Sequence, residues 1–272
     1  MAQPGQPDPR ELLSVAVAVV RPAAALARRL RAAGVDQVTT KTSDTDVVTA
    51  ADRAVEREVV AALSRARPVD TVLGEEYGQR GRPGGAAVRW LLDPIDGSVN
   101  YLYGLPWYAV SLAAEVDGEV VAGVVCHAGT GQEWTAATGH GAWSGGRRLH
   151  GSGQTELSQA LVATGFGYEP ARRAHQAGVL AGLISAVRDI RRIGAAALDL
   201  CLAAEGTVDA YYERGLSAWD HAAGGLVAAE AGLVVAGLGG QPAGPAMLVA
   251  APPALFGPLH DRLRELDAAG GP

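Results

Sequence analysis

Strand-like and helix-like segments follow one another along this chain without the regular alternation of a fully parallel sheet. Short apolar runs predict strands at residues 71–74, 88–92, 107–115, 119–126, 133–138, 142–143 and 208–212. Asp117-Gly118 joins two of these runs and is typical of a tight antiparallel turn. The pattern therefore predicts a layered α/β (α+β) fold whose sheets are partly antiparallel.

Apolar side chains at helical spacing predict a helix over residues 11–33 and a second helix over 50–67, which begins after Thr49. We expect Pro22 to kink or divide the first helix. Further helices are predicted at 180–186, at 195–204 before Gly206, and at 219–231 before Gly232. The Gly- and Arg-rich residues 78–86 are expected to form a loop.

The 272 residues, 48% of them hydrophobic, suffice for a sizeable core in one large domain or two small ones. Only 19% are charged, which excludes disorder of most of the chain. We expect residues 1–9 to be a frayed tail and residues 267–272 to be mobile.

The chain is acidic, with a net charge of −6, and its densest basic segments, residues 21–31 and 188–192, lie within apolar patterns. These arginines are typical of solvated helix or strand faces, so we expect no nucleic-acid partner. An acidic protein that handles an anionic substrate would need a local source of positive charge.

Cys126 and Cys201 each lie in an apolar stretch, which favours buried, reduced thiols over a disulfide or a metal site. No signal peptide is recognisable, and Arg21 and Pro22 interrupt the longest apolar run near the N-terminus. A cytoplasmic protein without a membrane segment is expected.

Acidic residues follow predicted strands or begin predicted helices at four places: Asp52, Glu75-Glu76, Asp93 with Asp96, and Asp220. Taken alone, each has an ordinary explanation. Asp52 and Asp220 suit helix caps, Glu75-Glu76 an exposed acidic pair, and residues 93–98 a turn. Independent caps and turns do not account for all four in this order.

Residues 93–98 read Asp-Pro-Ile-Asp-Gly-Ser directly after a predicted strand. If the chain turns here, the carboxylates of Asp93 and Asp96 and the carbonyl of Ile95 can face one point, a donor set that suits Mg²⁺. The amides of Gly97 and Ser98, at the start of the next element, could hold phosphate oxygens. Metal ligands and an anion-binding turn would then be adjacent, as hydrolysis of a phosphate ester requires.

With these residues the chain resembles the inositol monophosphatase family, one of the Mg²⁺-dependent, lithium-sensitive phosphatases. The motifs that carry the resemblance are residues 74–76, 90–101 and 219–224, with Lys41, residues 46–52 and 193–201 in support. It implies a five-layered αβαβα sandwich of the inositol monophosphatase and fructose-1,6-bisphosphatase type. A single domain over residues 10–266 would have two lobes, with the metal motifs in 41–101 and a C-terminal lobe over about 150–266. The resemblance also implies a homodimer.

The resemblance implies two to three Mg²⁺ ions. Glu75 and Asp93 would hold the first with the Ile95 carbonyl, and Asp93 would bridge to a second held by Asp96 and Asp220. A third, weaker ion would use Glu75 through water.

The remaining roles implied by the resemblance concern water and substrate. Asp52 and Ser98 would polarise the attacking water, with Ser98 standing where family members usually have threonine. The residues expected to contact substrate are Gly97, Ser98, Ala195, Ala196, Glu213 and Asp220. His221 is expected to be structural or to line the pocket, and Ser98 is disfavoured as a nucleophile because no histidine is near it in sequence.

The predicted reaction is hydrolysis of inositol 1-phosphate to inositol and phosphate by a metal-activated water. Histidinol phosphate is the second substrate candidate, followed by other sugar or polyol phosphates. 3′-Phosphoadenosine 5′-phosphate and fructose 1,6-bisphosphate phosphatases share the metal motifs. A different class of function, a non-catalytic regulator that binds protein or RNA, is disfavoured because the acidic set is intact.

Overall fold

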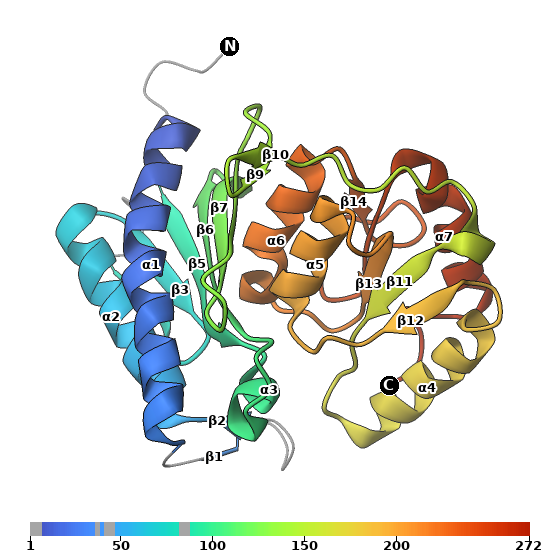
Figure 1. Ribbon diagram of the computed structural model, residues 1–272, viewed down its shortest axis with the longest axis horizontal. Coiled ribbons are helices and arrows are strands. Elements are labelled where there is room, and N and C mark those ends of the chain that lie inside the picture. Colours follow the sequence, from blue (N-terminus) through green and yellow to red (C-terminus); the bar gives the residue numbers. More distant parts are fainter. Residues whose placement is uncertain (1–6, 36–38, 41–46, 82–87) are drawn as a thin grey trace.

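The computed structural model describes residues 7–35, 39–40, 47–81 and 88–272, which leaves Lys41, Asp46 and most of the predicted loop 78–86 outside the described residues. Five layers lie side by side: two helices, a large sheet, two helices, a smaller sheet and two further helices (Figure 1). The predicted αβαβα sandwich is confirmed.

The outer helices α1 (Pro9–Ala33) and α2 (Ala50–Ala66) cover one face of an eight-stranded sheet (Figure 1). Its strands run in the order β10-β9-β8-β7-β6-β5-β3-β4, and only β3 and β5 pair in parallel. They are β3 (Thr71–Gly74), β4 (Gly78–Arg80), β5 (Arg89–Asp96), β6 (Ala109–Val116), β7 (Glu119–His127), β8 (Glu133–Ala137), β9 (Ala142–Ser144) and β10 (Arg147–Arg148).

The smaller sheet has the order β12-β11-β13-β15-β14, and β11 pairs in parallel with both neighbours. Its strands are β11 (Leu161–Thr164), β12 (Asp189–Arg191), β13 (Ala210–Glu213), β14 (Val234–Ala236) and β15 (Leu248–Ala251), with α4 (Pro170–Leu183) and α7 (Pro253–Glu265) outside. The short elements are β1 (Thr39–Thr40), β2 (Val47–Val48), α3 (Ser98–Tyr103) and a 3₁₀ turn at Leu157–Gln159.

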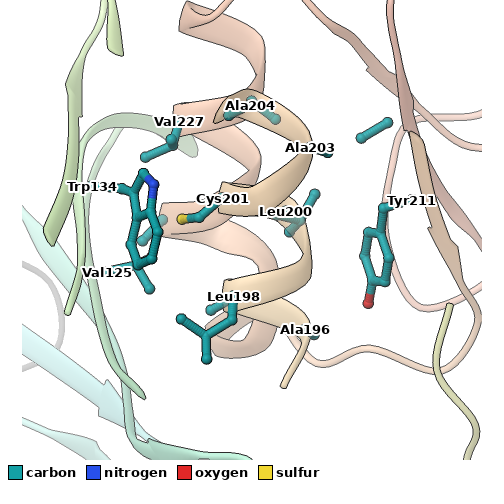
Figure 2. Packing of buried hydrophobic residues seen from close by; sticks show 14 of the residues in the cluster. Val125, Trp134, Ala196, Leu198, Leu200, Cys201, Ala203, Ala204, Tyr211 and Val227 are labelled. Atoms are coloured by element: carbon teal, nitrogen blue, oxygen red, sulfur yellow. The ribbon is translucent and has the colours of Figure 1, made fainter. Parts of the chain in front are cut away.

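Helices α5 (Ala196–Glu205) and α6 (Ala218–Glu230) form the middle layer and bury their side chains against both sheets. Figure 2 shows Cys201 of α5 directed toward Trp134 on the large sheet, with Tyr211 of β13 on the opposite side of the helix. Small residues allow the close packing: a Cβ at Gly123 would lie 2.9 Å from the Cα of Ala223, and one at Gly224 would lie 2.9 Å from the Cβ of Leu200.

Several local predictions need correction. Pro22 does not divide α1, because the residues on both sides of it, including Val19, Val20, Ala23 and Ala24, are buried in one core cluster that holds the helix in place. It also begins at Pro9 with Asp8 as its N-cap, so the expected fraying does not extend to Asp8 and Pro9.

The end of the chain is packed rather than free. Ala268 is buried in the core beneath the smaller sheet, and Arg214 donates hydrogen bonds to the carbonyls of Gly270, Gly271 and Pro272. Sequence composition alone could not reveal these partners, because Arg214 lies more than fifty residues away.

Other predictions hold with shifted limits. The hairpin β6–β7 turns at Asp117-Gly118, where both residues have positive φ, as such turns require. Cys126 and Cys201 are free and buried.

Part of the predicted loop, Gly78–Arg80, instead pairs with β3, and α4 begins ten residues before the predicted helix. Within the described ranges, no helix is long and apolar enough to cross a membrane.

The contact between β7 and α6 gives a stability prediction. Gly123→Ala should lower the free energy of unfolding by about 1–3 kcal/mol, because its methyl group would overlap the α6 backbone. Gly178→Ala is the matched control at an exposed position of α4, where the added Cβ meets no atom within 4 Å beyond its chain neighbours and the backbone of its own helix; it should leave stability unchanged or raise it by up to about 1 kcal/mol. Equal melting temperatures for the two variants would contradict this packing.

Candidate active site

The parallel pairing of β3 with β5 brings Glu75 and Asp93 together. In this register Gly74 lies opposite Leu92. Glu75 follows Gly74 and Asp93 follows Leu92, so the two acids are adjacent. The amide of Glu75 donates to the carbonyl of Leu92 at 3.2 Å, which extends the pairing to the first acid itself. Two carboxylates that are distant in sequence thus meet at adjacent strand ends.

A bulge in β5 places Asp93 and Asp96 on the same face. Residues three apart in a regular strand point to opposite faces. Here Asp93 pairs with Ser111 and Asp96 with Ala109, so three steps along β5 match two along β6. The extra residue of the bulge turns Asp96 back to the face on which Asp93 lies. Pro94 suits this interruption of the strand pairing, because it has no N–H to donate to the neighbouring strand.

The starts of two middle-layer helices face these strand ends. Asp96 accepts hydrogen bonds from the amides of Ala196 and Ala197 at 3.1 and 2.7 Å, and so caps α5, whose own N-cap, Ala195, has no side-chain acceptor. Asp220, in the first turn of α6, accepts from the amide of Ser217 at 2.7 Å. The N-cap of α6 is therefore Ser217 and not Asp220, which stands at the third helical position, bonds back to the Ser217 amide and also lines the cavity.

Asp52 has the predicted capping role and also contacts Ser98. It completes a capping box with Thr49 at the start of α2, and its other oxygen lies 2.8 Å from the hydroxyl of Ser98. The Ser98 hydroxyl also lies 2.9 Å from the Ile95 carbonyl, so its single hydrogen is directed to one of these two acceptors. The fully buried Asp52 carboxylate thus orients Ser98 from behind the cavity.

One cavity of about 440 Å³ collects nearly all the candidate residues. Among the residues that line it are Glu75, Asp93, Ile95, Asp96, Gly97, Ser98, Ala195, Ala196, Glu213 and Asp220. Asp52 is not part of this lining and reaches it through Ser98, and His221 is not part of it either. At Gly97 a side chain is excluded, because φ is +88° and a Cβ would lie 2.8 Å from the Trp107 carbonyl.

Burial and mutual repulsion raise the pKa values of the acidic group. For Asp93, burial is the larger cause, followed by the charges of Glu75, Asp96 and Asp220. The pKa of Asp220 is likewise raised by burial and then by Glu75 and Asp96. Burial raises the pKa of Asp96 to about 7, even though its bonds to the α5 amides act in the opposite direction. The group is therefore costly to ionise without a compensating cation.

The donor set fits a hard divalent cation, since it consists of carboxylates and a carbonyl. As the side chains stand in the described part of the chain, no three acidic, histidine or cysteine groups already surround a single metal position. Asp96 and Asp220 instead point carboxylate oxygens at helix amides. Binding an ion would thus require these side chains to turn within the cavity.

Sequence reasoning missed the positive charge of the cavity. Arg172, Arg192 and Arg214 also line it, although residues 188–192 were expected to be a solvated face. Arg192 counteracts the rise that burial causes in the pKa of Glu213, as does the Tyr211 hydroxyl, which donates to Glu213 at 2.6 Å. Arg192 directly precedes the motif at 193–201, and Arg214 directly follows the predicted substrate contact Glu213, so both could have been identified by position; Arg172 carries no such signal.

Comparison with known proteins decides the family. The sequence profile of the inositol monophosphatase family matches residues 8–266. The chain belongs to the inositol monophosphatase family. It is 45% identical over 278 residues to an inositol-1-monophosphatase of Mycobacterium leprae, with 96% of each chain covered. A protein of Pseudomonas aeruginosa named Nus factor SuhB is 41% identical over 200 residues, covering 72% of this chain and 74% of the relative.

Solved structures agree with this assignment. Mycobacterium tuberculosis SuhB superposes with a TM-score of 0.82 at 41% identity, covering 97% of this chain and 99% of that one. An inositol monophosphatase from Anabaena superposes with a TM-score of 0.82 at 29% identity, covering 94% and 96%. The chain is thus a member of a phosphatase family in sequence and in fold.

The raised pKa values predict how the stability of the metal-free protein depends on pH. Between the unfolded pKa of an aspartate, near 4, and the folded value of about 7 for Asp96, the native state binds more protons, so stability is lost as the pH rises. Above pH 6.5 the buried His127 and the half-buried His221, whose pKa values are lowered by desolvation, are neutral in the folded state and mostly neutral in the unfolded state, so they oppose this trend little. In EDTA, the melting temperature should fall between pH 6.5 and 8.5.

The Asp96→Asn variant provides the control, because it removes one of the titrating groups. Its melting temperature should fall less steeply over the same range. A wild-type melting temperature that rises across this range in EDTA would contradict the crowding of ionised carboxylates.

Proposed function

We propose that this protein is a Mg²⁺-dependent phosphomonoesterase that hydrolyses myo-inositol 1-phosphate to inositol and phosphate. The observation that carries the proposal is the lining of one cavity by Glu75, Asp93, Asp96 and Asp220, backed by Ser98 on Asp52. Family membership and the name of the 45%-identical relative support the substrate.

In this proposal Glu75, Asp93, Asp96, Asp220 and the Ile95 carbonyl hold two to three Mg²⁺ ions. The raised pKa values of Asp93, Asp96 and Asp220 support a cation here, because nearby positive charge would offset their repulsion. Bound Mg²⁺ supplies the charge that stabilises the phosphoryl oxygens and the leaving alkoxide.

Residues of the chain itself orient the attacking water and bind the substrate. The hydroxyl of Ser98 accepts a hydrogen bond from the attacking water and donates its own hydrogen bond to Oδ1 of Asp52, 2.8 Å from the Ser98 oxygen. The amides of Gly97 and Ser98 bind phosphate oxygens, and Glu213 accepts hydrogen bonds from substrate hydroxyls. The proposed contact through Ala196 requires its amide to leave Asp96, to which it now donates.

The arginines of the cavity suit a dianionic substrate. Arg172, Arg192 and Arg214 provide the local positive charge that an acidic protein of net charge −6 needs to attract a phosphate ester. The arginines would attract other phosphate monoesters equally well, and histidinol phosphate is the next candidate substrate. The cytoplasm as the site of action and a homodimer as the assembly are further parts of the proposal; the homodimer is drawn from the family resemblance.

Because some relatives are named Nus factor, a regulatory role is the second candidate function for this chain. The intact acidic set of the cavity favours catalysis, because a binding protein has no need to gather four mutually repelling carboxylates around one cavity. Phosphate release separates the two functions directly.

The test measures phosphate release from inositol 1-phosphate with and without Mg²⁺. Activity should require Mg²⁺, and Asp93→Asn should lower kcat/KM by about 100-fold or more, since changes even in the shell around metal ligands typically cost 10–100-fold. A panel with histidinol phosphate and fructose 1,6-bisphosphate should rank inositol 1-phosphate first.

Asp117→Asn is the matched control, because it makes the same chemical change in an exposed turn of the β6–β7 hairpin. It should leave activity unchanged, since asparagine also tolerates positive φ. Full activity of Asp93→Asn, or activity that persists without any divalent cation, would contradict the proposal.

A further inference from the structure

The turn that carries Glu75 is held from behind by a buried glutamate that no catalytic role accounts for. Glu56 lies in the second turn of α2 and has no exposed surface. Its carboxylate accepts hydrogen bonds from the amide of Glu76 at 2.8 Å and from the amide of Tyr77 at 3.0 Å. Both donors belong to the turn immediately after Glu75, so each carboxylate oxygen fixes one peptide of that turn.

The glycine before Glu75 shows how closely the two segments fit. A Cβ on Gly74 would lie 2.1 Å from Oε1 of Glu56, a separation that no pair of non-bonded atoms tolerates. The carboxylate of Glu56 thus occupies the space that a side chain at position 74 would need, and any such side chain would displace it. The acid and the glycine form a matched pair, one on α2 and one at the end of β3.

Glu75 is thus restrained on both sides. Its own amide donates to the Leu92 carbonyl of β5, and the two peptides after it donate to Glu56. Arg57, the next residue of α2, adds a third contact through the Tyr77 hydroxyl at 2.7 Å. With its backbone fixed this way, Glu75 lines the cavity that Asp93 also lines.

The same face of α2 also orients the other strand end. Asp52 and Glu56 are four residues apart, so they lie one turn apart on one face of the helix, and both are fully buried. Asp52 accepts from Ser98, just after β5, while Glu56 accepts from the turn after β3. Helix α2 therefore aligns the two acid-bearing strand ends with respect to each other.

We propose that Glu56 is a positioning residue for the metal site: it fixes the turn at residues 75–77 so that Glu75 can act as a ligand. The inference rests on the metal site of the proposed function, but concerns affinity for the ion rather than the reaction. Loss of the Glu56 carboxylate releases the turn, so that Glu75 samples other directions and binding of the ion must first restore the correct one.

The primary test is calorimetric titration of Mg²⁺ into the metal-free protein. Glu56→Gln keeps the shape of the side chain but presents an NH₂ group to one of the two backbone amides. It should raise the Kd for Mg²⁺ about 10–100-fold, while kcat at saturating Mg²⁺ returns to within a few-fold of wild type. Glu58→Gln, on the exposed side of the same helix, removes the same charge and should change neither quantity.

A second variant approaches the same contact from the opposite side. Gly74→Ala leaves Glu56 in the sequence but places a methyl group where its carboxylate lies, and should weaken Mg²⁺ binding as well. This variant keeps the inference testable if Glu56→Gln does not fold. Glu56→Asp, which retains the charge but is one methylene shorter, should give an intermediate Kd.

The outcomes separate the inference from its alternatives. A Glu56→Gln protein with a lower melting temperature but an unchanged Kd for Mg²⁺ would show that Glu56 is only structural, and normal Mg²⁺ binding by a folded Gly74→Ala protein would show the same. A lowered kcat at saturating Mg²⁺ with unchanged Kd also overturns the inference. Wild-type protein that binds no Mg²⁺ would overturn the proposed function and this inference together.

Discussion

The rest of the site depends on four like-charged side chains that line one cavity, two of which, Asp93 and Asp96, are buried. Glu75, Asp93, Asp96 and Asp220 face a common space, and their proximity, added to burial, raises the pKa values of Asp93, Asp96 and Asp220. Such crowding is unfavourable in a protein without a compensating cation, and a fold that maintains it gives up stability for function. The surrounding structure is arranged so that the carboxylates stay together despite that repulsion.

Backbone geometry provides the restraint. The parallel register of β3 and β5 fixes Glu75 beside Asp93, and the bulge in β5 turns Asp96 to the same face. Backbone amides at two helix starts accommodate part of the negative charge, since Asp96 caps α5 and Asp220 accepts from the amide of Ser217, the N-cap of α6. The positive end of the cavity, with Arg192 near Glu213, offers an environment of the opposite sign for the substrate.

The apolar pattern predicted a mixed, layered α/β fold, and the family resemblance supplied its five-layer order; of the smaller sheet the pattern predicted only the strand near β13. The acids at 75, 93, 96 and 220 could be found because they stand next to strand ends and helix starts that the apolar pattern marks. The sequence alone was insufficient where the partner is distant in sequence. The contacts of Arg214 with residues 270–272, and of Glu56 with the turn after Glu75, are set by packing that no local pattern encodes. Pro22 failed as a helix breaker for the same reason, because tertiary burial on both sides outweighed the local preference.

The most direct test of the central claim is the position of a divalent cation in a crystal grown or soaked with Mn²⁺, located by its anomalous scattering. The account predicts peaks inside the cavity with carboxylate oxygens of Glu75, Asp93, Asp96 and Asp220 as ligands, and with Asp96 and Asp220 turned away from the helix amides that they now accept from. Anomalous peaks found only elsewhere on the protein, with the four carboxylates still on their present partners, would contradict it.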